Sequence, residues 1–202
     1  NQPEFTAPVW QYFDNQVNEQ SVTTGRHMAK QHRRTLDAIE KRFGVDRHIL
    51  LGIWSIESRY GEALGNPRVM RNIVSSLATL AYADKRRQKY ATQQLIAALK
   101  IAQNGDVPIN QLTGSWAGAM GHTQFIPTSY QAWAVDFDGN GRRDIWNSIP
   151  DALASAANLL KDNGWRSGQT WGYEVVLPAG RKFPSGRMTL AQWQAIGVVR
   201  AN

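Results

Sequence analysis

One segment of this sequence is apolar on almost every side of the helix that it would form. Residues 46–58 read DRHILLGIWSIES, and a helix that is hydrophobic all round is buried inside a protein. Since burial requires other elements around it, the segment predicts a buried helix enclosed by the rest of the fold. The apolar residues that cover most of its circumference are Ile49, Leu50, Ile53, Trp54 and Ile56.

A carboxylic acid, Glu57, lies on the last turn of this helix, just before the turn-like sequence Arg59-Tyr60-Gly61. Desolvation and the negative end of the helix dipole both disfavour the charged carboxylate. Both therefore favour an acid that stays protonated near neutral pH, as a general acid must. The structural alternative is a Glu57 that reaches solvent or pairs with Arg59, because structural ion pairs also perturb acids. The helix alone leaves both open.

Helical spacing of apolar residues continues over about the first 160 residues, and short loops separate the segments. After Trp165 the sequence changes to Gly, Pro and short β-like pieces such as residues 173–178. The length of 202 residues fits one good-sized domain. The predicted helices cover about residues 8–20, 26–43, 46–58, 70–83, 86–103, a short stretch after Pro127, 148–163 and 190–196.

The net charge of +7 favours anionic partners. The basic clusters are short, at residues 32–34, 85–89 and 141–143, and none is the long basic arm or zinc finger of a nucleic-acid-binding protein. An anionic polymer such as a cell wall fits the charge equally well. The absence of cysteine excludes disulfides and zinc–thiolate sites. No run of apolar residues approaches the roughly 20 that span a membrane.

Residues 114–130, GSWAGAMGHTQFIPTSY, combine small residues with polar and aromatic ones. The glycines allow backbone to approach backbone, or a ligand, closely. Ser115 and Gln124 are suited to hydrogen-bond a hydroxyl or acetamido group, and Trp116, Phe125 and Tyr130 offer stacking faces. Sugars require this mixture, since their rings present apolar faces and polar edges. The alternative is tight packing around a helix that begins at Pro127.

Residues 136–144, DFDGNGRRD, match the first nine positions of an EF-hand calcium loop, with oxygen side chains at positions 1, 3, 5 and 9 and Gly at position 6. The match fails at position 12, where Asn147 replaces the bidentate Glu. Asp151, at the start of the next predicted helix, could close a longer loop instead. The alternative is an ordinary Asp/Asn/Gly turn. A single loop of this kind also argues against a calcium sensor.

Four pieces of the sequence occur in an order and spacing that resemble the lytic transglycosylase B family of peptidoglycan-cleaving enzymes. They are GIWSIESRYG at 52–61 and the segments 76–90, 114–146 and 151–165. The resemblance implies a mainly α fold: a lysozyme-like α+β catalytic domain with an EF-hand-like loop and a small irregular or β C-terminal part. Residues 1–202 would form one catalytic region, with a helical body at about 8–165 and a tail at 166–202. The chain ends before the family's C-terminal cleft element.

The resemblance also implies roles for individual residues. Glu57 matches the single catalytic acid/base. Leu159 stands where some relatives carry a Tyr. Residues that match substrate-binding positions are Ser115 and Gln124 in the sugar groove, Tyr60 and Phe125 beside it, and the pair Arg86 and Arg87 near the cleft. Residues that match a structural Ca²⁺ site, the one ion expected, are Asp136, Asp138, Asn140, Arg142 through its carbonyl, and Asp151. No cofactor is required for the chemistry.

The implied reaction is cleavage of the β-1,4 bond between N-acetylmuramic acid and N-acetylglucosamine with formation of a 1,6-anhydromuramic acid end. The implied partner is the peptidoglycan glycan strand, with no nucleic acid, no transmembrane segment and a monomeric chain. The implied location is the periplasm, and a lipid anchor on the full-length precursor is left open. Two alternatives remain at this point: a goose-type lysozyme-like hydrolase and a non-catalytic peptidoglycan-binding module.

Overall fold

The computed structural model describes residues 8–170 and 172–201. Residues 1–7, 171 and 202, which the predicted single region 1–202 also includes, lie outside the described residues. The chain divides into two compact units, Asn1–Ser167 and Gly168–Asn202.

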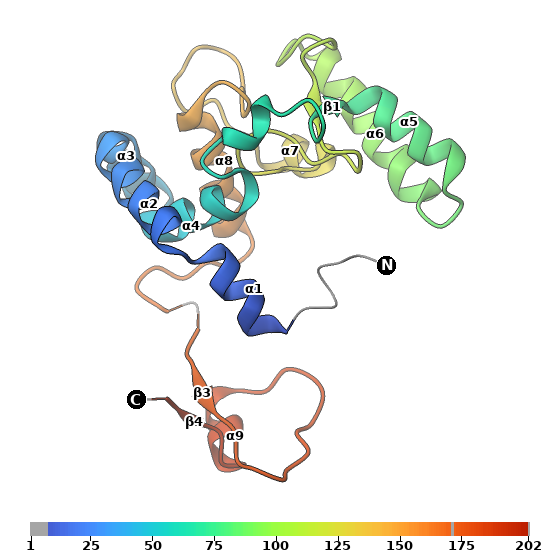
Figure 1. Cartoon of the computed structure of the whole chain (residues 1–202). Helices are drawn as coiled ribbons and strands as arrows, with labels where there is room; N and C mark the ends of the chain where they lie inside the picture. The colour runs from blue at the N-terminus through green and yellow to red at the C-terminus, as the bar shows by residue number, and fades with distance from the viewer. Residues whose placement is uncertain (1–7, 171, 202) are drawn as a thin grey trace. The chain divides into compact units, whose positions relative to one another are not determined.

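The first unit is built almost entirely of helices, which confirms the prediction of a mainly helical protein with small β elements (Figure 1). In the part of the chain that the structure describes, every helix is too short or too polar to cross a lipid bilayer. The elements of the first unit are α1 (Val9–Gln16), α2 (Glu19–Gln31), α3 (Arg33–Phe43), α4 (Arg47–Ser58), the 3-10 turn η2 (Glu62–Gly65), β1 (Arg71–Asn72), α5 (Ile73–Ala83), α6 (Gln88–Gln103), β2 (Thr113–Gly114), α7 (Pro127–Trp133) and α8 (Ile149–Asp162).

Helix α4 is the predicted apolar helix, but it is buried on one side only. Its first turn is capped by Asp46, whose side chain accepts a hydrogen bond from the His48 N–H at 2.7 Å. Leu50, Leu51 and Trp54 lie in the core, whereas Ile56 is 53% exposed. The expectation that the whole circumference is buried is therefore wrong, and the exposed apolar side borders the groove described below.

The segment predicted as one helix over residues 26–43 is two helices, α2 and α3, that meet at His32. The backbone of His32 leaves the helical region with φ −102° and ψ 20°, and its N–H still donates to the Met28 carbonyl at 2.9 Å. Its ring meets the Trp54 ring edge-on, with ring centroids 5.5 Å apart. No Gly or Pro marks this break in the sequence. It is accompanied instead by this tertiary contact with α4.

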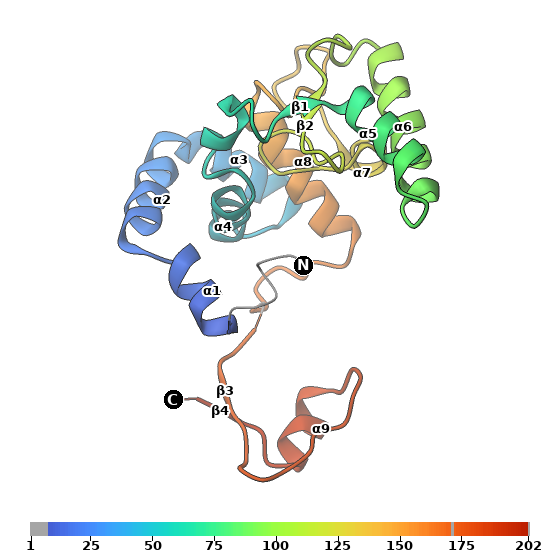
Figure 2. The ribbon, with the colours of Figure 1, turned by 45° about the vertical axis from the view of Figure 1, so that its right-hand side comes forward.

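Helix α8 is the most deeply buried helix of the described residues. It begins at the cap Ser148, whose hydroxyl accepts from the Asp151 N–H at 3.3 Å, and Pro150 occupies the first turn. Its residues 151–157 are all buried because α3, α4 and α7 pack around it (Figures 1 and 2). The core therefore lies between α8 and these three helices, with α6 against the far side of α7.

Helices α5 and α6 form a hairpin whose members lie side by side (Figure 2). The entrance to α5 is fixed by Asn72, whose side chain accepts from the Ser75 N–H at 3.0 Å. Just before it, β1 pairs antiparallel with β2, with Arg71 opposite Gly114. These strands have two residues each, too few to show the alternation that predicts a strand. Their pairing anchors the start of the glycine-rich segment beside α5.

The second unit holds β3 (Val175–Val176), α9 (Leu190–Ala195) and β4 (Val199–Arg200). The strands pair antiparallel, with Val175 opposite Arg200. Thr189 caps α9 and exchanges hydrogen bonds with Gln192 in a capping box. The β-like piece and the short helix predicted after Trp165 are both present.

Candidate functional site

The chain leaves α4 through three consecutive residues in the left-handed region, which with Glu57 and Ser58 form the Glu57 turn (residues 57–61). The φ angles are 52° at Arg59, 58° at Tyr60 and 92° at Gly61. Left-handed backbone is unfavourable for residues other than Gly, and it persists at sites where the surroundings enforce it. Among the described residues only one other non-glycine residue has a positive φ, and it is Gln124. Two of these three non-glycine residues, Tyr60 and Gln124, are predicted substrate-binding residues.

Glu57 lies on the last turn of α4 with its side chain exposed, so it is not buried with its helix and reaches solvent, as one of the two alternatives expected. Surrounding protein atoms nevertheless displace enough water to raise the pKa of Glu57 above its ordinary value. Among the ion pairs of the described residues none involves Glu57, so the alternative in which Arg59 neutralises it is not what the structure shows. An unpaired carboxyl with a raised pKa can act as a proton donor.

Opposite this turn lies the Gln124 loop (residues 114–125). Backbone hydrogen bonds close it in two stretches: the Ser115 N–H donates to the Ala119 carbonyl at 2.8 Å, and Met120 exchanges bonds with Phe125. Met120 is bridged to both Gly114 and Phe125, so it links the two ends of the loop. Gly114 is required here, because a Cβ would lie 2.2 Å from the Ala119 carbonyl oxygen. The predicted close approach of backbone to backbone is therefore present, and it holds Ser115 and Gln124 on one compact loop.

The Gln124 groove is a hollow of about 210 Å³ between this loop and α4. Ile53 lines it and lies one turn before Glu57 on the same face of α4, whereas Glu57 itself is not a lining residue. The i, i+4 spacing of Ile53 and Glu57 could have identified Ile53 from the sequence. The lining residues are Ile53, Thr123, Gln124, Phe125, Ile126, Ser129, Ala156, Leu159 and Leu160.

The predicted substrate residues contribute differently to this site. The Gln124 side chain donates to the Gly121 carbonyl at 2.9 Å, which leaves its amide oxygen as an acceptor. Phe125 is only 6% exposed and reaches the groove from the core. Tyr60 does not line the groove. Its ring packs edge-on against Trp54 with centroids 5.3 Å apart.

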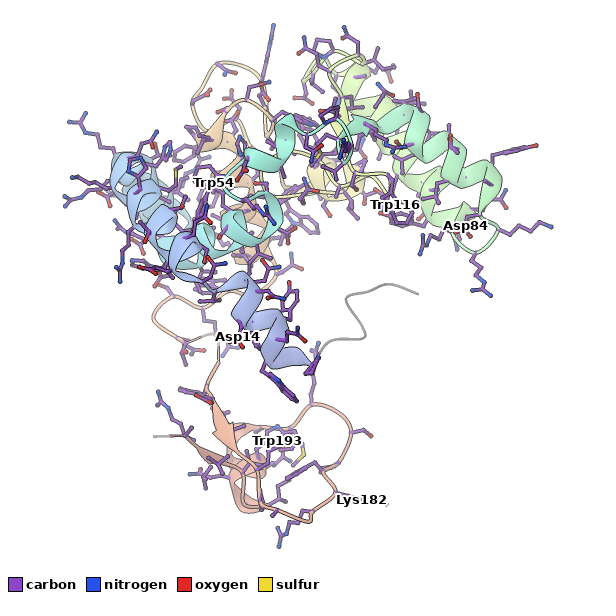
Figure 3. The ribbon with its side chains drawn as sticks, in the orientation of Figure 1. Asp14, Trp54, Asp84, Trp116, Lys182 and Trp193 are labelled. Carbon is purple, nitrogen blue, oxygen red and sulfur yellow. The ribbon has the colours of Figure 1, made fainter. Side chains whose placement is uncertain are left out.

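Ser115 and the arginine pair lie near a second hollow, which follows α5. This Trp116 hollow of about 370 Å³ is lined by Trp116 and by α5 residues such as Ser76. The Arg87 guanidinium stacks on the Trp116 ring at 4.9 Å, at the end of the α5–α6 hairpin where Figure 3 labels Trp116 and Asp84. Arg86 is exposed beside it. The structure thus joins Arg87 to Trp116 and leaves both outside the Gln124 groove.

The predicted metal loop brings three carboxylates together. Oxygens of Asp136, Asp138 and Asp151 lie within 4.8 Å of one another. Asp136 accepts backbone hydrogen bonds from Gly139 and Gly141, each at 2.8 Å, which wraps the loop around it and lowers its pKa.

Asp151 reaches this loop from the first turn of α8 and is fully buried. Burial raises its pKa, because the charged form loses water. Among the ion pairs of the described residues none neutralises this cluster. Oxygen ligands with no basic partner fit a hard cation such as Ca²⁺.

The remaining residues of the metal loop fit the same reading. The Asn140 N–H donates to Asp136 at 3.1 Å, and its side-chain oxygen accepts from the Arg142 N–H at 2.9 Å. Asn147, at the position where the EF-hand match fails, turns its amide to Asp144 at 2.9 Å. Asp151 is the carboxylate of α8 that reaches this loop, where it accepts hydrogen bonds from the Phe137 and Asp144 N–H groups at 2.8 and 3.0 Å. Its role as the closing ligand stays a prediction.

Comparisons with known proteins identify the relatives of this chain. The family profile described as Transglycosylase SLT domain matches residues 1–202. Membrane-bound lytic murein transglycosylase B from Escherichia coli (strain K12) is 37% identical over 153 residues, which is 75% of this chain and 41% of that protein.

Two solved structures share the fold. SltB3 from Pseudomonas aeruginosa, in complex with NAG-NAM-pentapeptide, aligns with a TM-score of 0.86 and 51% identity over 98% of this chain and 52% of its own. The same protein has also been solved with NAG-anhNAM-pentapeptide. The lytic transglycosylase Slt35 from Escherichia coli, in complex with calcium, aligns with a TM-score of 0.84 and 30% identity over 96% of this chain and 61% of its own.

The chain thus spans about half the length of these relatives. The resemblance seen in the sequence motifs is confirmed by the profile, by the relative from Escherichia coli and by both folds. Over residues 1–202, the chain belongs to the transglycosylase SLT domain family.

Proposed function

We propose that this chain cleaves the β-1,4 bond between N-acetylmuramic acid and N-acetylglucosamine in peptidoglycan and leaves a 1,6-anhydromuramic acid end. The family supports the proposal, as do the relatives. One relative is a lytic murein transglycosylase, and another was solved with both a NAM-containing and an anhydro-NAM-containing muropeptide. The activity belongs to proteins about twice as long as this chain, and the proposal assigns it to the residues 1–202.

The observation that carries the proposal is an isolated acid beside an apolar groove. Glu57 follows the lining residue Ile53 by one turn on the same face of α4, and no described residue that lines this groove is an Asp or Glu. Glycosidases that use two carboxylates hold them about 5–10 Å apart. We therefore assign both proton transfers to Glu57, whose pKa is raised, with attack by a hydroxyl of the substrate itself.

In the proposed reaction Glu57 starts protonated and donates its proton to the glycosidic oxygen as the C1–O4 bond breaks. The resulting carboxylate then removes the proton from the C6 hydroxyl of the muramic acid, whose oxygen bonds to C1. No water is consumed, and Glu57 regains its proton. The raised pKa of Glu57 supports the first step, because it increases the protonated fraction near neutral pH. Apolar side chains such as Leu159 and Leu160 reduce the access of competing water.

We assign the sugar contacts from the hydrogen bonds that the loop leaves open. The Gln124 amide oxygen can accept from a sugar hydroxyl or acetamido N–H. The Ser115 oxygen accepts from the Ala119 N–H at 3.0 Å, which leaves the hydroxyl proton free to donate. Phe125 forms the floor of the groove, Tyr60 supports the Glu57 turn, and Arg86 and Arg87 attract anionic groups of the strand.

We propose that a structural Ca²⁺ binds to Asp136, Asp138, Asn140, the carbonyl of Arg142, and Asp151. The ion would offset the repulsion between the clustered carboxylates and fasten the loop to the start of α8. It would supply no step of the reaction. The complex of Slt35 with calcium supports this assignment.

The substrate places the proposed activity in the periplasm, where glycan strands are the partner of a monomeric chain. A relative named as membrane-bound supports attachment to a membrane, and a lipid anchor on a full-length precursor is one form that it could take. We further propose that residues 1–202 act as one catalytic region.

Incubation with purified sacculi tests the proposal. The turbidity of the suspension should fall with time, and soluble muropeptides should accumulate in proportion to enzyme concentration. A protein that sediments with sacculi and releases nothing would be a peptidoglycan-binding module, and the proposed activity would be wrong.

The net charge of +7 should contribute to binding of the acidic polymer. Because exposed charges are screened over about 10 Å at 0.1 M salt, we expect the fraction bound to sacculi to decrease as sodium chloride is raised from about 20 mM to about 500 mM. The measurement is cosedimentation of the Glu57→Gln variant, which is not expected to degrade its ligand. Binding that is indifferent to salt would show that stacking and neutral hydrogen bonds dominate.

A further inference from the structure

One buried histidine of the Gln124 loop, which has no part in the proposed chemistry, lies against the Glu57 turn. It is His122, and it is 8% exposed. Its ring lies against Gly61, where a Cβ would come within 2.4 Å of the His122 Cε1 atom. Gly61 is therefore required both by its φ of 92° and by the histidine that covers it.

The backbone of His122 is bonded to the same turn. The Ser58 hydroxyl donates to the His122 carbonyl at 2.7 Å and accepts from the Gly61 N–H at 3.0 Å. On the other side, the His122 N–H donates to the Ile145 carbonyl at 3.0 Å. Ser58 follows Glu57 directly, and His122 precedes Gln124 by two residues, so these bonds join the two strained segments close to both side chains.

The ring completes the connection through the core. The Trp54 indole N–H donates to His122 Nδ1 at 3.0 Å, and Trp54 is 1% exposed. Because Nδ1 accepts, the ring is neutral and carries its proton on Nε2. Trp54 lies one turn before Ser58 on α4, so the bond fixes the side of the helix that supports the Glu57 turn.

We infer that His122 is a positioning residue, which fixes the distance between the Glu57 carboxyl and the Gln124 amide by bonding the Glu57 turn to the Gln124 loop. The inference rests on the proposed function, since it concerns the same reaction. The Gln124 amide is held within its own loop by its bond to the Gly121 carbonyl, so its distance from Glu57 depends on how the loop is bonded to the Glu57 turn. A displacement of about 1 Å in a catalytic geometry can lower the rate about 100-fold.

The surroundings of His122 make this arrangement sensitive to acid. Burial lowers the pKa of His122, and the positive charge of His32 would lower it further, whereas Asp144 and a backbone hydrogen bond with Trp146 raise it. The pKa of His32 is itself lowered by burial and by His27. A protonated His122 would carry a donor at Nδ1, facing the Trp54 donor, and this bond would be lost. Because the pKa of His122 is lowered, the bond is lost only as the pH falls through that lowered value, below the ordinary range of histidine.

Four variants test the inference in the sacculus assay. His122→Leu removes the acceptor, and Ser58→Ala removes only the bridging hydroxyl, in case the first variant does not fold. His122→Asn keeps an acceptor close to the position of Nδ1 but does not titrate. His48→Leu makes the same substitution at an exposed histidine outside this group of charges and is the matched control.

We expect kcat to fall about 10- to 100-fold in His122→Leu and in Ser58→Ala, with KM changed by less than about threefold, because the chemical geometry and not the binding surface is altered. His122→Asn should recover most of kcat and should keep its activity to lower pH than the wild type. The alkaline limb, set by Glu57, should be the same in both. A purely structural role would lower the melting temperature without separating kcat from KM or moving the acid limb.

A second measurement does not depend on activity. The Trp54 indole N–H resonance should shift on acidification of the wild type at the pH of the acid limb, and should stay constant in His122→Asn. Wild-type protein that fails to cleave sacculi would disprove the proposed function, while this resonance would still report the bond. Folded His122→Leu and Ser58→Ala with wild-type kcat, or a Trp54 resonance that ignores pH, would overturn the inference.

Discussion

Replacing Glu57 by Gln should reduce the cleavage of sacculi by about 10⁴-fold or more. General acid–base catalysis commonly contributes about 10²–10⁴-fold, and here one group would perform both proton transfers. Gln keeps the size of the side chain but can neither donate nor accept the catalytic proton. The measurement is the initial rate of muropeptide release at equal protein concentration, with binding to sacculi measured in parallel and expected to survive.

The matched control is Glu62→Gln, which alters a second exposed glutamate five positions further along, in η2. It should retain near-normal activity, and a comparable loss there would indicate a second carboxylate in the reaction. Glu57→Gln should not unfold the protein. A raised carboxyl pKa means that the folded state holds its proton more tightly than the unfolded state, so stability falls as pH rises through the folded pKa. The neutral Gln removes that penalty at neutral pH.

Calcium should stabilise the protein through the Asp136–Asp151 loop. At a calcium concentration of about 100 times Kd, binding to the folded state alone adds about 2.7 kcal/mol. For a domain of this size that corresponds to a rise in Tm of roughly 5–10 °C. The measurement is thermal unfolding in calcium and in chelator.

Asp136→Ala should abolish the calcium-dependent rise and leave the calcium-free protein folded. The N–H groups of Gly139 and Gly141, which lose this acceptor, belong to exposed residues and can bond to water, and the Asn140 N–H keeps its bond to Asp138. Asp14→Ala, at an exposed aspartate of α1 outside the loop (Figure 3), is the matched control and should keep the full rise. Identical melting curves in calcium and in chelator would reduce the loop to an ordinary turn.

The sequence predicted the parts of this site that depend on local pattern. The apolar residues of α4 and the turn-like Arg59-Tyr60-Gly61 located Glu57 at a helix end, and the spacing of Asp136 and Asp138 located the metal loop. Asp151 was found as well, because an acid in the first turn of the next helix can reach back to a loop. Each of these signals lies within about 15 residues of chain.

Features that depend on tertiary contacts were not predictable in the same way. The break at His32 has no Gly or Pro, and the ring contact with Trp54 that accompanies it joins residues 22 positions apart. Glu57 lies at the surface because one side of α4 faces a groove. The apolar residues are spread evenly around this helix, so the sequence does not indicate which side that is. Likewise, the His122–Trp54 bond spans 68 positions. From the sequence alone, His122 was indistinguishable from an ordinary packed imidazole.

The proposed reaction is tested most directly by the mass of its products. Wild-type protein is incubated with sacculi, and a second portion of the same sacculi is digested with a lysozyme. Every disaccharide-containing product of this chain should be lighter than its lysozyme counterpart by one water, because the muramic C6 oxygen, and not a water, forms the new bond to C1. Products of equal mass would show that water attacks, and would make this chain a goose-type lysozyme-like hydrolase that uses the same acid.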